Sequence, residues 1–177
     1  MREESNVNAL ASRTQIWSAI RTVYAAALIL FVITITIGIL NGLDLYDPDH
    51  DTLMTHVHSG TLGWITLAVS ATIMLIFTAD RRLSDSEQAA GRILSYAMIG
   101  AIVLYVAAFF AGDRVPGDRI QRPIAGSILF LVVIWFLVWM VRQNRTFSTS
   151  SVARLGLTLA WISLLVGAVL GLSLIHI

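Results

Sequence analysis

Residues 54–79 read MTHVHSGTLGWITLAVSATIMLIFTA, a run without a single Asp, Glu, Lys or Arg. A helix needs about 20 mainly apolar residues to cross the hydrocarbon core of a bilayer. Four further runs meet this condition, at residues 17–40, 93–111, 124–141 and 152–172. Their only charged members, Arg21 and Arg154, lie near span ends, where long side chains reach the headgroups. The sequence therefore predicts an all-α, polytopic membrane protein with five transmembrane helices across residues 17–172.

The composition supports this class. Of the 177 residues, 56% are hydrophobic and 13% charged, and the mean hydropathy is +0.77, whereas soluble domains carry about 25% charged residues. The chain has no cysteine, which excludes disulfides, thiolate metal sites and iron–sulfur clusters. A net charge of +1 argues against nucleic acid as a partner, so the expected surroundings are a lipid bilayer.

The arginines predict the orientation, because cytoplasmic loops carry an excess of positive charge. With the N-terminus inside, residues 1–16 form a cytoplasmic segment. The inner side then holds nine arginines: Arg2, Arg13, Arg21, Arg81, Arg82, Arg92, Arg142, Arg145 and Arg154. The outer side holds three: Arg114, Arg119 and Arg122. The start of the second span consequently lies at the outer surface.

Two histidines open that second span, in MTHVHSGTLGW. Positions two apart on an α-helix differ by about 200° around the axis, so His56 and His58 cannot both face one metal. If one faces the bundle, the other faces the headgroups or the loop. An inward imidazole can hydrogen-bond another helix, relay protons, or ligate a metal or haem.

A haem would also need flat space beside its ligand. Gly60 and Gly63 lack side chains and would leave that space, and Trp64 would line the edge of the slot. The alternative interpretation is a pair of interfacial histidines beside glycines that serve helix packing.

The segment THVHSGTLGWITL, residues 55–67, resembles the second transmembrane helix of subunit I in the haem–copper oxidase superfamily. The likeness is to the branch that holds nitric oxide reductases and uncharacterised relatives. In that family a histidine five residues before the glycine is an axial ligand of a low-spin haem. The resemblance implies that His58, which precedes Gly63 by that interval, ligates a haem of the b type, with His56 as second choice. Neighbouring families of nitric-oxide-handling membrane proteins are an alternative.

The resemblance further implies a membrane redox protein that moves electrons through this haem in a prokaryotic inner (plasma) membrane. It covers only the first five helices of a fold with twelve or more. The copper ligands, the second axial ligand and the reduction of oxygen or nitric oxide would then belong to helices absent from this chain. The segment alone is not expected to be catalytic, and the remaining helices of a longer subunit are expected partners.

The last residues bear on that expectation. Residues 173–177, SLIHI, resemble translated sequencing-adaptor sequence, so we expect a non-native tail. A genuine apolar terminus is the alternative. In that case His176 would lie on the same membrane face as His58, where it could serve as a second haem ligand.

The outer loops carry charge of both signs. Asp47, Asp49 and Asp51 alternate around His50 like the start of a calcium loop, but Thr52 stands where an EF-hand needs glycine. A solvated acidic loop is therefore favoured, and with Asp44 it would attract a basic soluble electron donor. The three outer arginines would pair with haem propionates or anchor the chain to headgroups.

A second class of function fits the same residues. The chain would then be a small helical membrane protein, structural or part of a transporter, without a redox cofactor, and its histidines would be packing groups.

The orientation can be tested with single cysteines, because the chain has none of its own. A thiol reagent that does not cross membranes should label Asp47→Cys in intact cells and label Ser84→Cys only after the membrane is opened. The opposite pattern would place the N-terminus outside.

Overall fold

The computed structural model describes residues 15–45, 47–79, 82–112, 118–144 and 151–174, without the side chains of 118–119 and 171–174. Within these ranges the regular structure is entirely helical, and five helices are long and apolar enough to cross a membrane. The predicted fold class and number of spans are confirmed. The orientation of the N-terminus stays a prediction, and so does the interpretation of the final residues, since 175–177 lie outside the described ranges.

Four of the five spans are single helices: α2 (Trp17–Gly42), α5 (Asp85–Ala111), α6 (Asp118–Asn144) and α7 (Val152–Leu174). The second span consists of three consecutive pieces, α3 (His50–His58), the π-helix η1 (Ser59–Ile65) and α4 (Thr66–Thr78). Because a π-helix pairs residues five apart, it is wider than an α-helix and turns the side chains that follow it to new directions.

Two helices begin well before their apolar runs, which corrects the predicted boundaries. Asp49 caps α3, and its carboxylate accepts a hydrogen bond from the backbone N–H of Thr52 at 2.8 Å. The second span therefore starts at His50 and not at Met54. At α5, Ser84 and Glu87 form a capping box, so this helix starts at Asp85, before the run at 93–111. Capping side chains satisfy the free N–H groups of a first turn.

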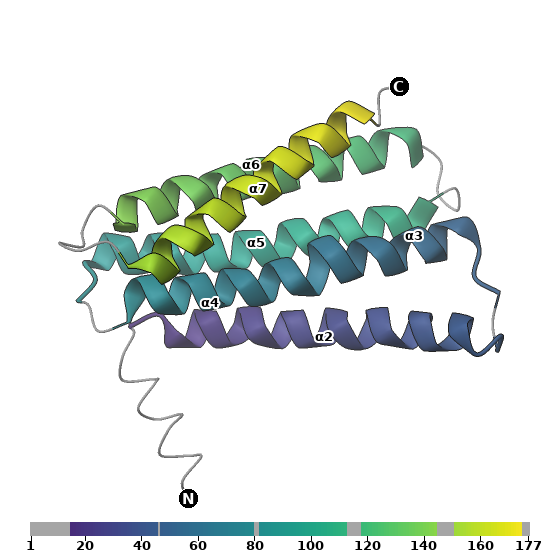
Figure 1. Ribbon diagram of the computed structural model, residues 1–177, viewed down its shortest axis with the longest axis horizontal. Coiled ribbons are helices and arrows are strands. Elements are labelled where there is room, and N and C mark those ends of the chain that lie inside the picture. The colour runs from purple at the N-terminus through teal and green to yellow at the C-terminus, as the bar shows by residue number, and fades with distance from the viewer. Residues whose placement is uncertain (1–14, 46, 80–81, 113–117, 145–150, 175–177) are drawn as a thin grey trace, which may run out of the picture.

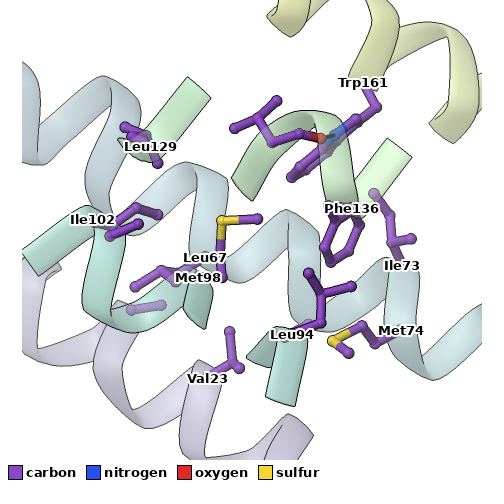
Figure 2. Packing of buried hydrophobic residues seen from close by; sticks show 14 of the residues in the cluster. Val23, Leu67, Ile73, Met74, Leu94, Met98, Ile102, Leu129, Phe136 and Trp161 are labelled. Atoms are coloured by element: carbon purple, nitrogen blue, oxygen red, sulfur yellow. Dashed lines mark hydrogen bonds between the residues drawn. The ribbon is translucent and has the colours of Figure 1, made fainter. Parts of the chain in front are cut away.

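The five spans run roughly along the long axis of the molecule, with α2 at one side of the bundle and α6 and α7 at the other (Figure 1). The second span packs between α2 and α5, and α6 packs on α5. The last helix, α7, contacts α6 and α4. The interior between the helices is filled by apolar side chains (Figure 2), which include Val23, Leu67, Leu94, Ile102 and Phe136.

Trp161 is the most deeply buried of the α7 side chains that pack on this core. Trp161 is 1% exposed, and its ring packs on Phe136 of α6 with centroids 4.4 Å apart. Its indole N–H donates a hydrogen bond to the carbonyl oxygen of Val133 at 3.1 Å. No other residue of 152–170 is as deeply buried, although Leu157, Leu164 and Leu165 also pack on the core while half-buried.

We expect Trp161→Ala to lower the free energy of unfolding by about 3–5 kcal/mol, the usual cost of removing a buried Trp ring. Unfolding in lipid bicelles would measure the loss. Leu159→Ala is the matched control on the same helix, because Leu159 is 55% exposed and should cost far less. Equal losses for the two variants would contradict the proposed anchor.

Candidate functional site

His56 faces α2. Its Nδ1 lies 2.8 Å from the carbonyl oxygen of Thr34, and its ring passes so close to Gly38 that a Cβ there would lie 2.8 Å from the ring carbon Cε1. A glycine at this point allows the imidazole to approach the α2 backbone. His56 thus joins two helices. The expectation that the second histidine faces the headgroups or the loop is therefore wrong, because His56 contacts α2.

His58 faces the opposite neighbour, α5. Its Nδ1 lies 3.3 Å from the hydroxyl oxygen of Tyr105, and the two rings meet edge to face at 89°. Phe109, one turn further along α5, covers the imidazole with centroids 3.8 Å apart and an interplanar angle of 35°. The predicted divergence of the two imidazoles is confirmed, since they reach different helices.

A cavity of about 600 Å³ lies beside His58, between the second span, α5, α6 and α7. Its walls are mostly apolar, and the polar groups on them are His58, Tyr105, Arg122, Thr66 and Ser163. The remaining lining residues are Leu62, Phe109, Gly126, Leu129, Phe130, Val133, Leu164, Gly167 and Ala168. Volume and lining are typical of a site for a small organic ligand.

The haem slot expected beside Gly60, Gly63 and Trp64 is not where the cavity lies. Gly60 and Gly63 point at α2, where Cβ atoms would meet Thr34 and Leu30 at 3.3 and 3.4 Å. Trp64 packs on Phe31 of the same helix, with centroids 5.0 Å apart. None of the three lines the cavity.

The glycines that do border the cavity are Gly126 of α6 and Gly167 of α7. A Cβ built on Gly167 would meet nothing within 4 Å. These two helices, and not the histidine helix, therefore leave the free space beside His58.

An ion pair closes one end of the site, and sequence reasoning did not find it. The Arg122 guanidinium of α6 donates to the Asp51 carboxylate of α3 at 2.5 Å, and both side chains are mostly buried. The guanidinium also lies over the Phe109 ring, 5.2 Å from its centroid. Both charges belong to outer ends of spans under the predicted orientation, which was the available signal for their pairing.

The same contact corrects the acidic-loop interpretation. Asp51 is a buried member of the first turn of α3, so it does not belong to a solvated loop, whereas Asp49 caps this helix and remains exposed. Within the described ranges no group of three His, Asp or Glu side chains could hold a metal ion. Arg114, Arg119 and His176, which were also candidates, lie outside the described side chains.

Gly112, at the end of α5, packs directly on the Asp51 carboxylate, where a Cβ would overlap its oxygens. Its φ of +43° falls in a region that glycine adopts at little cost. The end of α5 is thus packed against the ion pair.

Three features of the site bear on a cofactor. The Nε2 atom of His58 makes no hydrogen bond to a described residue, and the Nε atom of Arg122 is buried without a partner there. The walls beside them are apolar. One imidazole nitrogen and one guanidinium N–H are therefore available on residues that line a hydrophobic cavity.

Comparison with protein-family models, curated proteins and solved structures finds no match to this chain.

The ion pair predicts strong coupling between Asp51 and Arg122. Breaking a mostly buried pair leaves the partner's charge without compensation, so Asp51→Asn and Arg122→Gln should each destabilise the protein. The double variant should be more stable than the sum of the two losses predicts, by about 0.5–3 kcal/mol. Unfolding in bicelles measures this cycle, and strictly additive losses would argue against the pair.

Proposed function

We propose that the cavity holds a haem and that Nε2 of His58 is an axial ligand to its iron. The observation that carries the proposal is an imidazole that borders an apolar cavity of about 600 Å³ while only its Nδ1 is engaged. Neutral imidazole is a common axial ligand of haem iron, and the cavity is large enough for a ligand of drug size.

Other residues of the cavity fit the same group. Gly126 and Gly167 leave room for a flat macrocycle, and Leu129 and Val133 offer it apolar contacts. The unpartnered Nε–H of Arg122 provides a donor for a carboxylate such as a haem propionate, and charge-assisted hydrogen bonds of this kind are strong. The proposed haem site does not include His56, Gly60, Gly63 or Trp64, because these residues pack against α2.

A bound haem would supply one-electron transfer. The chain would hold the imidazole in a fixed direction, exclude water with its apolar walls and offer the free Nε–H of the Arg122–Asp51 pair as a donor. The resemblance of residues 55–67 to the haem–copper oxidase superfamily supports this function. It also supports a prokaryotic cell membrane as the location, with oxygen or nitric oxide reduction, copper and a basic electron donor assigned to a longer assembly.

A second candidate is a helical membrane protein without a redox cofactor. The observation in its favour is that both imidazoles already have protein partners, Thr34 for His56 and Tyr105 for His58. In that case the two histidines would stabilise helix contacts, as hydrogen bonds between membrane helices do by about 0.6 kcal/mol each.

A reduced-minus-oxidised absorption spectrum of the full chain, purified from cells supplied with haem precursor, separates the two. We expect haem α and Soret bands for the wild type and their loss to background in His58→Ala. The matched control is His50→Ala, because His50 is exposed at the start of α3, and it should keep the bands. A wild type without haem bands, or bands that persist in His58→Ala, would contradict the proposal.

A further inference from the structure

The His58 imidazole is held from two directions by one helix. Tyr105 approaches its edge, with the hydroxyl oxygen 3.3 Å from Nδ1, and Phe109 covers its face. The two aromatic rings also contact each other, with centroids 5.0 Å apart. Because Tyr105 and Phe109 lie one turn apart on α5 and both are mostly buried, the ring has little freedom to rotate.

This arrangement leaves one chemical choice open, the position of the imidazole proton. If the Tyr105 hydroxyl donates to Nδ1, the proton of neutral His58 sits on Nε2 and that atom cannot bind a metal. If Nδ1–H donates to the hydroxyl oxygen, Nε2 keeps its lone pair. The partner of one ring nitrogen thus decides what the other can do.

The cation on the cavity wall favours the second arrangement. Arg122 is the only charged residue that lines the cavity in the described part of the chain, and its guanidinium lies over the ring of Phe109, which in turn covers the imidazole. The partner of Arg122, Asp51, does not line the cavity, so the positive end of the ion pair faces the cavity, and a positive end attracts a lone pair and repels an N–H dipole on the same wall. This charge arrangement, together with an acceptor at the Tyr105 hydroxyl oxygen, favours the Nδ1–H form of His58.

We propose that Tyr105 is a positioning residue, which accepts a hydrogen bond from Nδ1–H of His58 and so leaves the Nε2 lone pair free at the cavity. The tautomer is a property of the chain itself. Its consequence, tighter ligation of haem iron, rests on the proposed function above.

The tautomer can be measured without any cofactor. ¹⁵N spectra of histidine-labelled, haem-free protein in lipid nanodiscs distinguish Nδ1–H from Nε2–H imidazole, and the His58→Ala spectrum assigns the His58 signals. We expect the Nδ1–H form in the wild type and a shift to mainly Nε2–H in Tyr105→Phe, which removes only the hydroxyl. Tyr96→Phe on the same helix is the matched control, because Tyr96 is 55% exposed, and it should leave the spectrum unchanged.

An Nε2–H signal in the wild type would overturn the proposal, and so would an unchanged tautomer in a folded Tyr105→Phe. If Tyr105→Phe does not fold, Tyr105→Gln offers a second side chain that can accept from Nδ1–H. It should keep the wild-type tautomer, and loss of that tautomer in folded Tyr105→Gln would count against the proposal.

Titration with haemin then tests the consequence. Loss of an outer partner of a ligating histidine weakens metal affinity by about 10–100-fold, so Tyr105→Phe should raise the Kd for haemin by that factor while Tyr96→Phe does not. An equal Kd in the wild type and Tyr105→Phe would overturn the positioning role. A wild type that shows the Nδ1–H tautomer but binds no haemin would instead refute the haem proposal and leave the tautomer assignment intact.

Discussion

A histidine within a membrane span needs a protein partner for at least one ring nitrogen, because lipid offers none. His56 meets this need at the α2 backbone and His58 at the Tyr105 hydroxyl of α5. The two contacts act in different directions on one short helix, so together they define the rotation of α3 between its neighbours. That rotation decides which side chains of the span border the cavity and which pack against α2.

The π-helix that follows carries this arrangement into the second half of the span. It is tied to α2 through Ser59, whose hydroxyl lies 2.8 Å from that of Thr34. Gly60 and Gly63 bring the same face close to α2, while Leu62 and Thr66 turn towards the cavity. π-helical turns are rare, and many of those known lie at functional sites. Here it separates the packing face of the span from the face that borders the cavity.

The sequence predicted the five spans well, because runs without charge as long as 54–79 have few alternatives in a folded protein. It did not predict where helices begin, since the caps Asp49 and Ser84 are polar and lie outside the apolar runs. The opposed directions of His56 and His58 followed from helical periodicity. For Gly60 and Gly63 the sequence left two interpretations open, and their close approach to α2 agrees with the packing role and not with the haem slot. Nothing in the sequence specified Arg122 as the partner of Asp51 or Tyr105 as the partner of His58.

The last helix, α7, buries fewer residues than the other spans. Along residues 152–170 only Trp161 is classed as buried, yet this helix supplies one complete wall of the cavity, with Ser163, Leu164, Gly167 and Ala168. Segments with few buried contacts open at the lowest free energy. A hydrophobic molecule dissolved in the bilayer would therefore meet its smallest barrier sideways, at the seam beside α7, and would reach His58 without passing through water.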